Sequence, residues 1–287
     1  MVEEVLHYLC TKPGNLYIDV TFGAGGHTRT LLESDPTCKV IALDWDQYAI
    51  EMYGPPLKEQ FGDRFQLIWG NFGLLYKILK KERVPLVDGI LADFGTSQVQ
   101  IQRLPGMSFS RDTFLDMRMS PSHQAITAAE VLATASEKKL YEIFMQLGEE
   151  QKARAIAQAI VKERTAKRPI QTTTQLAAIV QTVVPPYVRN VHSATKVFQA
   201  LRLYVNQELN NISAFLPAAL QALKKDGVLA CISFHSLEDR LVKQFLSEQE
   251  GLGVVTVLTK KVAVPSPEEI ERNPSSRSAK LRVARKN

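Results

Sequence analysis

The stretch Ile18-Asp19-Val20-Thr21-Phe22-Gly23-Ala24-Gly25-Gly26-His27 decides the fold. It is typical of a buried strand that ends in a glycine turn, and such a turn brings backbone N–H groups and a helix N-terminus towards a ligand. Asp44 ends the next apolar run, 21 residues beyond Gly23, where an acid can hold a ribose. Thr28 stands where a dinucleotide fingerprint has its third glycine, which argues against NAD. The stretch predicts a nucleotide-like ligand, and a tight turn without any ligand is the alternative.

Strand-like apolar runs alternate with helix-like stretches through the first third of the chain. The runs cover residues 16–20, 40–43, 65–69 and 87–92. This alternation predicts an α/β fold with a doubly wound parallel sheet, which binds ligands beyond the carboxyl ends of its strands. The residues just past those ends are Gly23–His27, Asp44, Gly70–Phe72 and Asp93–Ser97.

After Gln102 the alternation stops, and helical periodicity runs from 104 to 194 with breaks at Pro121 and Pro169. We therefore expect a discontinuous sheet domain, residues 1–103 and 195–287, with an inserted helical domain at 104–194.

The last third of the chain returns to the sheet. A helical pattern runs from 196 to 223, Lys224–Gly227 ends it, and 228–234 is predicted as a fifth buried strand. Two more strand candidates, 254–260 and 279–283, have no helical pattern between them. They are expected to pair antiparallel at the sheet edge.

Composition narrows the class of protein. With 287 residues and 45% hydrophobic content the chain can bury a substantial core, and no apolar run approaches the roughly 20 residues that span a bilayer. The first residues carry acids where a signal peptide needs bases. Cys10, Cys38 and Cys231 form no C-x-x-C pair, and the five histidines lack metal-ligand spacing. We expect a cytoplasmic protein without membrane contact and without a bound metal.

Positive charge is concentrated near the end of the chain. Residues 260–287 hold eight bases and three acids, a surplus equal to the net charge of +5 for the whole chain. Such a tail attracts phosphate backbones, and a solvated tail that keeps the protein dispersed is the alternative.

Two strand ends hold side chains that can carry chemistry. Asp93 follows the fourth strand, where a carboxylate can bind the cofactor or accept a proton, or can cap the next helix. The polar segment Ser233–Arg240 follows the fifth strand, and a helix cap would not explain His235 or Arg240. Asn71 and Phe72 could flank an adenine, although packing alone could explain Phe72. Arg118, in a cluster of Asp and Arg residues at 108–119, is suited either to a structural salt bridge or to a phosphate.

Seven segments together closely resemble the MraW (RsmH) family of bacterial small-subunit ribosomal RNA cytosine-N4 methyltransferases. The resemblance covers nearly the whole chain and rests on Asp19–His27, Phe109–Met119, Thr127–Glu130, Gly148–Glu150, Ala194–Arg202, Ser233–Arg240 and Arg277–Arg282. In this chain Trp45 stands where the family usually has a basic residue.

The resemblance implies a class I methyltransferase sheet with an inserted helical substrate-recognition domain, S-adenosylmethionine as cofactor, and N4-methylation of a decoding-centre cytidine in 16S rRNA of the small ribosomal subunit. Carried over by position, the cofactor residues are Gly25, Gly26, His27, Asp44, Phe72, Asp93 and Gln100. The candidates for assisting the cytosine amine are Asp93, His235 and Ser236, and those for RNA contact are Arg118, Lys196, Arg202, Arg240 and the basic tail.

Two other classes of function stay open on the sequence. One is a methyltransferase that acts on a protein or small molecule, and the other is a ribosome-assembly factor that keeps the cofactor site without turnover. The oligomeric state is also open, with a homodimer as one alternative.

Overall fold

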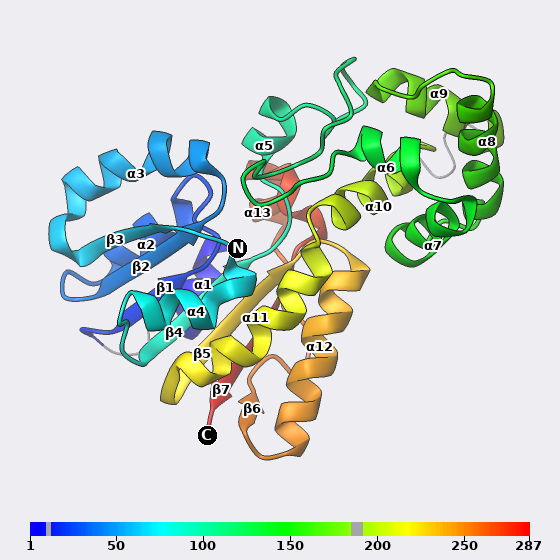
Figure 1. Ribbon diagram of the computed structural model, residues 1–287. Helices are drawn as coiled ribbons and strands as arrows, with labels where there is room; N and C mark the ends of the chain where they lie inside the picture. Colours follow the sequence, from blue (N-terminus) through cyan, green and yellow to red (C-terminus); the bar gives the residue numbers. More distant parts are fainter. Residues whose placement is uncertain (10–12, 185–191) are drawn as a thin grey trace. The chain divides into compact units, whose positions relative to one another are not determined.

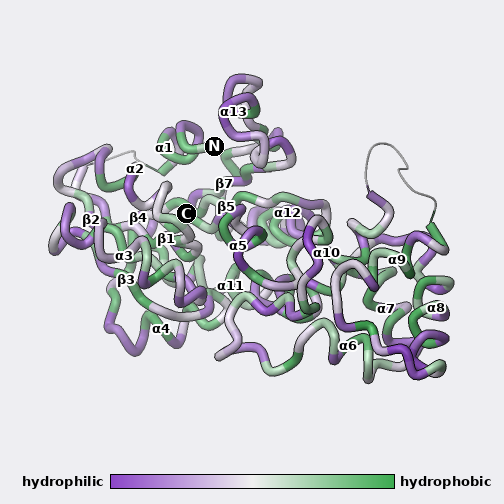
Figure 2. Tube along the Cα trace, turned by 90° about the horizontal axis from the view of Figure 1, so that it is seen from above, coloured by the Kyte–Doolittle hydropathy of each residue, from purple (hydrophilic) through white to green (hydrophobic). Residues whose placement is uncertain are grey.

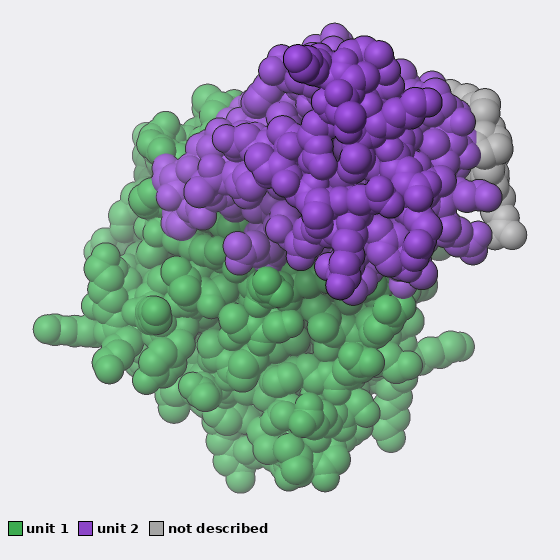
Figure 3. Space-filling view, turned by 45° about the vertical axis from the view of Figure 1, so that its right-hand side comes forward, with its two compact units in different colours: residues 1–95, 209–287 green, residues 96–208 purple. Residues whose placement is uncertain are grey.

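The computed structural model describes residues 1–9, 13–184 and 192–287, which form two compact units. Unit 1 comprises 1–95 and 209–287, and unit 2 comprises 96–208 (Figure 3). These boundaries differ from the expected 103/104 and 194/195. Helix α10 (Thr195–Val205) lies in unit 2 because its Phe198 and Leu201 share a buried cluster with Phe144 and Ile156 of that unit.

Unit 1 is built on a seven-stranded sheet of order β3-β2-β1-β4-β5-β7-β6 (Figure 1). The first five strands are parallel, whereas β7 runs antiparallel to both of its neighbours, β5 and β6. The predicted α/β class and the antiparallel pairing of the last two strands are confirmed. The strands are β1 (Leu16–Asp19), β2 (Lys39–Asp44), β3 (Phe65–Trp69), β4 (Val87–Asp93), β5 (Leu223–Ser233), β6 (Val255–Val257) and β7 (Lys280–Lys286).

Helices cover both faces of this sheet, as its nearly continuous apolar strands require. On one face Ile18 and Ile90 pack with α4, α11 and α12, and on the other Val40 and Leu91 pack with α1, α2 and α3. The helices of unit 1 are α1 (Val2–Leu9), α2 (Gly26–Ser34), α3 (Gln47–Phe61), α4 (Leu75–Lys81), α11 (Glu208–Ala222, whose first residue is assigned to unit 2), α12 (Ser236–Gly251) and α13 (Pro267–Arg272), with 3-10 turns η1 (Gly62–Arg64), η2 (Phe72–Leu74) and η3 (Pro274–Ser278).

Strand β5 begins earlier than predicted. Helix α11 ends at Ala222, and Leu223 already pairs with Val87 of β4. The pairing then shifts before Gly89 meets Val228, and Asp226 has a φ of 62° within the extra residues. Lys224–Gly227, expected to end a helix, is therefore an irregularity between two parts of one strand.

The single helix expected at 196–223 is two helices, α10 and α11. Gln207 between them has a φ of 50°. The Asn206 side chain donates from Nδ2 to the Met117 carbonyl and accepts at Oδ1 from the Met119 N–H, both at 2.8 Å. These contacts hold the break from residues almost 90 positions away, so no local pattern reports it.

Helix α13 was not predicted from its Pro- and Ser-rich surroundings. Ser266 accepts a hydrogen bond from the Glu269 N–H, and Pro267 occupies the first turn, where a proline is tolerated. The helix is mainly hydrophilic (Figure 2), so it shows no apolar periodicity.

Unit 2 is helical, as the periodicity of its sequence indicates. Leu140, Ile156, Leu176 and Leu201, from four different helices, meet in one buried cluster, and helices such as α8 alternate between hydrophobic and hydrophilic residues (Figure 2). Besides α10, the helices are α5 (Gln98–Arg103), α6 (Ala128–Thr134), α7 (Glu137–Gly148), α8 (Ala153–Thr165) and α9 (Thr173–Val183).

The expectations on membrane spans and on cysteines can be compared with the structure only over the described residues. Within those residues no helix has the length and apolar character needed to cross a bilayer. Cys38 and Cys231 are buried free thiols, whereas Cys10 lies outside the described residues.

Candidate active site

The glycine turn after β1 is tied to the end of β2. The Gly23 N–H donates to Oδ2 of Asp44 at 2.7 Å, and the Phe22 N–H donates to the Leu43 carbonyl at 2.8 Å. Gly23 and Gly25 have φ values of 54° and 78°, which residues with a Cβ rarely adopt. Hydrogen bonds therefore hold the ends of β1 and β2 together, with the glycine turn between β1 and α2 fixed against β2.

Gly25 and Gly26 open helix α2 and form a cradle without side chains. A Cβ on Gly25 would lie 3.0 Å from the Phe22 ring, whereas a Cβ on Gly26 would meet nothing within 4 Å. Gly25 is the N-cap, and no side chain caps the first turn. Backbone N–H groups at such a helix start attract an anionic group, such as the carboxylate of an amino-acid ligand.

Thr28, at the position of the missing third glycine, has a structural role. It is fully buried, and its hydroxyl donates to Oδ2 of Asp19 at 2.7 Å. The other oxygen of Asp19 accepts from the Thr21 N–H, and the Thr21 hydroxyl in turn accepts from the Asp93 N–H at 2.7 Å. Thr28, Asp19 and Thr21 thus connect the glycine turn to the end of β4.

Asp44 ends β2, and both of its carboxylate oxygens accept backbone hydrogen bonds. Oδ2 binds the Gly23 N–H and Oδ1 binds the Asp46 N–H at 2.9 Å. Burial nevertheless raises the pKa of Asp44 to about 6, because desolvation outweighs these two hydrogen bonds. The neighbouring Trp45 is buried, and its carbonyl accepts from Nε1 of Trp69.

Asp93, the last residue of β4, lies close to His27, the second residue of α2. We name these two residues the strand-end pair. His27 Nε2 lies 3.7 Å from Asp93 Oδ2, within ion-pair distance. Burial lowers the pKa of His27 to about 4, so the imidazole is neutral near pH 7. Burial, reinforced by the Asp19 carboxylate, raises the pKa of Asp93 to about 7. The contact therefore joins a neutral imidazole to a half-protonated carboxyl, and not two full charges.

The strand-end pair also keeps polar atoms without partners. Oδ1 of Asp93 and Nδ1 of His27 are buried and make no hydrogen bond within the described part of the chain. A buried polar atom without a partner costs free energy, about 1–3 kcal/mol in mutational data. Such atoms, beside a cradle of glycine N–H groups, fit a ligand that brings both an acceptor and donors, as an amino-acid nucleoside does.

The polar segment after β5 starts helix α12. His235 is its N-cap, and the buried Glu238 carboxylate accepts from the Phe234 N–H at 2.8 Å and the His235 N–H at 3.4 Å. His235 Nε2 lies 3.3 Å from Oε1 of Glu238. The expectation that a helix cap would not explain His235 is therefore wrong, because His235 is itself the cap. Ser236 and Arg240 are exposed in the first turns of α12.

The remaining cofactor candidates lie in different settings. The Phe72 ring, at the end of β3, packs against Phe94 and Phe215 with centroids 5.7 Å apart in both cases. Gln100 belongs to unit 2, where its side chain and Ser97 form a capping box at the start of α5. Phe72 thus joins the glycine turn, Asp44 and Asp93 in unit 1, whereas Gln100 does not.

The predicted RNA-contacting arginines of unit 2 are held by carboxylates. Arg118 donates to both oxygens of Asp116, at 2.6 and 3.0 Å, and Arg202 to both oxygens of Glu208, at 2.9 and 3.0 Å. Lys196 is exposed on α10 and donates to the Glu149 carbonyl. Of the two alternatives for Arg118, the structural salt bridge is the one that its contacts show.

The end of the basic tail is an inner strand of the sheet, β7, whereas its other bases are exposed: Lys260, Lys261, Arg272 and Arg277. Arg282 of β7 pairs with both oxygens of Asp239, and Lys286 donates to the carbonyls of Leu220 and Leu223, each at 2.7 Å. Unit 2 holds 14 bases and 9 acids, whereas unit 1 holds 21 of each. The net positive charge therefore belongs to unit 2, because acids elsewhere in unit 1 balance the tail.

Sequence reasoning missed Thr28, Asp19 and Glu238. Asp19 was within the stretch that decided the fold, and its place at the end of an apolar strand was the available signal. A signal was available for Glu238 as well, because an acid three residues after an N-cap residue predicts a capping box. Within the described residues no three His, Cys, Asp or Glu side chains come together in a way that could hold a metal ion.

Comparisons with known proteins place the chain in a family. The model of the MraW methylase family matches residues 1–287. A Sulfurihydrogenibium protein named ribosomal RNA small subunit methyltransferase H is 43% identical, with 99% of this chain and 97% of that protein covered. Proteins of the same name from Cyanothece and Desulfotalea psychrophila are 45% and 42% identical over 99% and 100% of this chain, covering 92% and 96% of their own lengths. Of the solved structures, TrmN from Thermus thermophilus is 12% identical with a TM-score of 0.47, over 100% of this chain and 48% of that one.

The resemblance seen in the seven sequence segments is thus confirmed, with the sheet order and the strand-end site described above in the same chain. This chain belongs to the MraW methylase family and is an S-adenosylmethionine-dependent methyltransferase.

Proposed function

We propose that this protein methylates the exocyclic N4 of a decoding-centre cytidine in 16S rRNA, with the small ribosomal subunit as partner and the cytoplasm as compartment. Methylation of small-subunit rRNA follows from the names of its relatives. The position and the atom are our proposal. The resemblance of the seven sequence segments supports both, and one structural observation carries the choice of an amine as the methyl acceptor. Asp93, at the end of β4, keeps a buried carboxylate oxygen without a partner, and an amine donor would complete it.

The glycine turn and its neighbours would hold the cofactor. Gly25 and Gly26 offer backbone N–H groups to the amino-acid end, Asp44 lies where it can accept from the ribose, and Phe72 lies at the next strand end. His27, neutral near pH 7, borders the same turn without adding a charge beside a cation. When bound, S-adenosylmethionine supplies a methyl group activated by a positive sulfonium.

Asp93 is suited to assist the cytosine amine. The lone pair of that amine is conjugated into the ring, so a hydrogen bond from an amine N–H to Asp93 would help the lone pair localise as attack begins. The nitrogen must also lose a proton, and a carboxylate whose pKa is about 7 can accept it near neutral pH.

His235 and Ser236 would act at the neighbouring strand end. The His235 ring is engaged in the start of α12, which suits positioning of the polypeptide after β5. The exposed Ser236 hydroxyl can contact the base or its ribose. Gln100 is proposed as a cofactor residue only because the resemblance implies it, and it belongs to unit 2.

Unit 2 would recognise the RNA. It carries the whole net charge of +5, which favours a phosphate backbone. Lys196 and Arg240 are exposed and are proposed to contact phosphates directly, whereas Arg118 and Arg202 would shape the surface through their carboxylate partners.

The test is transfer of labelled methyl groups to unmodified small subunits, followed by nucleoside analysis. N4-methylcytidine as the labelled product supports the proposal. A different labelled nucleoside refutes the N4 assignment, and label in ribosomal protein favours a protein methyltransferase. Cofactor binding without transfer to any RNA favours a non-catalytic assembly factor.

A further inference from the structure

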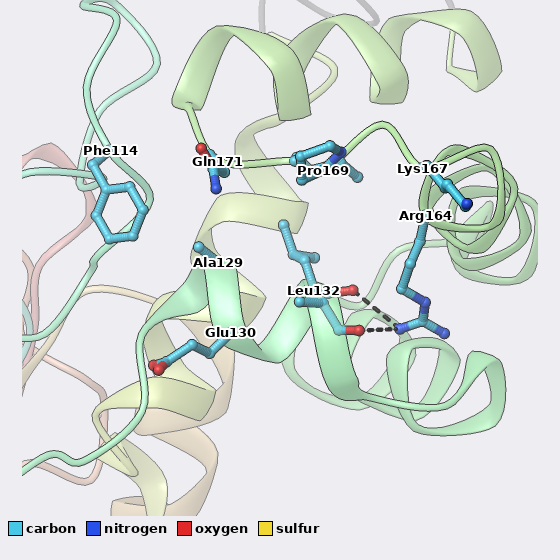
Figure 4. A pocket seen from close by; sticks show the side chains of 10 residues that line it. Phe114, Ala129, Glu130, Leu132, Arg164, Lys167, Pro169 and Gln171 are labelled. Atoms are coloured by element: carbon cyan, nitrogen blue, oxygen red, sulfur yellow. Dashed lines mark hydrogen bonds between the residues drawn. The ribbon is translucent and has the colours of Figure 1, made fainter.

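Unit 2 holds a cavity of about 300 Å³ that is lined by none of the site residues assigned above (Figure 4). It lies between α6 and the segment that joins α8 to α9. Its volume is at the lower end of the range for small-ligand sites. Its wall is mainly apolar, from Ala129, Leu132, Ala133, Pro169 and Ile170.

An aromatic ring stands at one side of this cavity. Phe114 is 47% exposed, which is unusual for phenylalanine in a well-packed domain. Its backbone is fixed, because it bridges to Thr172 and the next residue, Leu115, donates to the Gln171 carbonyl at 2.8 Å. The backbone that carries the ring is thus fixed, and about half of the ring is open to a ligand.

Two cations stand at the opposite side (Figure 4). Arg164 donates from Nη1 to three carbonyls, those of Leu132, Ala133 and Ala135, which orders its guanidinium before any ligand binds. Lys167 is exposed and follows the last turn of α8, with a φ of 56°. Glu130 lines the cavity too, and its capping hydrogen bonds with Thr127 use Oε2.

We infer that this cavity, which we call the α6 cavity, binds one unstacked base of the RNA outside the base that is methylated. Phe114 stacks on the base, Glu130 accepts from a base N–H, and Lys167 with Arg164 neutralises the adjoining phosphate. Aromatic platforms beside cations are how proteins hold single-stranded RNA. A net positive charge on unit 2 favours this occupant over an apolar or basic peptide. The exposed Phe114 ring favours it over an acidic peptide, because a base offers a flat face that stacks on the ring. The inference rests on the proposed rRNA substrate.

The test measures binding of a naked, unmodified small-subunit rRNA transcript to the full chain by fluorescence anisotropy. Loss of one base stack is worth roughly 5- to 100-fold in affinity, so Phe114→Ala should weaken binding by about tenfold. Phe114→Tyr keeps the platform and should bind within about twofold of the wild type. Lys167→Ala should weaken binding by a few-fold and lower the salt slope of log K by about one.

Matched controls separate this site from general damage. Met145→Ala removes another exposed apolar side chain of unit 2, and Lys138→Ala another exposed cation, and both should bind RNA as the wild type does. S-adenosylhomocysteine binding by calorimetry should be unchanged in Phe114→Ala. In transfer assays the RNA KM should rise while kcat stays within about twofold.

The outcomes distinguish the two proposals. Unchanged RNA affinity in Phe114→Ala overturns the base site, whatever the methylated product is. Weaker binding to whole subunits with unchanged binding to naked rRNA also overturns it, because the occupant is then a ribosomal protein. If the wild type makes no N4-methylcytidine but Phe114→Ala still loses RNA affinity, the base site stands and the proposed reaction fails.

Discussion

The strand-end pair of unit 1 and the two arginine–carboxylate pairs of unit 2 treat charge in opposite ways. His27 and Asp93 are half-buried, and each keeps one buried polar atom that no described residue satisfies. Desolvation lowers the pKa of His27 and raises that of Asp93, so both shifts favour the neutral form. Arg118 and Arg202 each meet a carboxylate through two hydrogen bonds. All four residues stood out in the sequence as candidate site residues. The structure separates those that keep an unpaired polar atom, which we call poised, from those whose charge is paired, which we call satisfied, and we expect chemistry from the poised ones.

The largest effect is expected at the poised carboxylate. Asp93→Ala should lower methyl transfer by at least about 100-fold, since a positioned acid or base contributes 10²–10⁴ in rate. Labelled transfer to unmodified small subunits measures it, and the far-ultraviolet circular dichroism should not change. Asp88→Asn is the control, because Asp88 lies on the same strand but binds Lys224 and the Leu16 N–H. Near-normal turnover of Asp93→Ala would remove Asp93 from the site.

The second effect is on pH dependence. With a pKa of about 7, Asp93 loses its ionised form tenfold per pH unit below 7, so log kcat/KM should rise with slope one and level off above about pH 7. Asp44, with a pKa of about 6, would add a second, lower inflection through cofactor binding. Rate profiles from pH 5 to 9 test this, and Asp44→Asn isolates the upper inflection. A flat profile contradicts the acceptor role.

The same shift has a consequence for stability. The folded pKa of Asp93 lies above its unfolded value, so folding favours the protonated form and this stability is lost as pH rises from about 4 to 7. Asp93→Asn should therefore raise Tm at pH 8 by about 1–3 °C and change it less at pH 5. Thermal unfolding at both pH values measures it, and a lower Tm at pH 8 contradicts the shift.

The third effect concerns the glycine cradle. Gly25→Ala should weaken S-adenosylhomocysteine binding by about tenfold or more and lower stability by about 1–2 kcal/mol, because the residue has a positive φ and little room for a Cβ. Calorimetry and denaturant unfolding measure the two changes. Gly253→Ala has a similar φ of 71° in open space, so it should carry the backbone strain alone and keep cofactor affinity. Equal cofactor affinity in both variants contradicts the cradle.

The smallest effect on function is expected at the satisfied charges. Arg202→Ala removes two hydrogen bonds from the buried Glu208 carboxylate and should cost about 1–3 kcal/mol of stability. RNA affinity, measured in conditions where the variant is folded, should change by less than about threefold. The double variant Arg202→Ala with Glu208→Gln should recover part of the stability. A large, salt-dependent loss of RNA binding would place Arg202 among the phosphate contacts instead.

Much of this organisation could be predicted from the sequence, and the failures share a cause. The glycine turn, Asp44 and Asp93 follow apolar runs, so strand periodicity alone placed them at one edge of the sheet. The break at Asn206 depends on Met117 and Met119, almost 90 positions away, which local pattern does not encode. The partners of Thr28 and Arg202 lie across a turn between two elements, outside the period of a single helix or strand. The bases of the tail that precede β7 are exposed, as expected. The strand itself was expected at the sheet edge, because nothing local shows that β7 lies between β5 and β6.

The discontinuity of unit 1 bears on how the chain is made. Unit 2 is one continuous segment, whereas the sheet needs β5, β7 and β6 from residues that are synthesised after it. At roughly 5–20 residues per second, the 25 residues from 209 to the end of β5 take about 1–5 s to appear. During that time the apolar edge of β4, with Ile90, Leu91 and Ala92, lacks its partner strand β5. An exposed strand edge promotes aggregation, so the nascent chain is most vulnerable after unit 2 is complete and before β5 arrives.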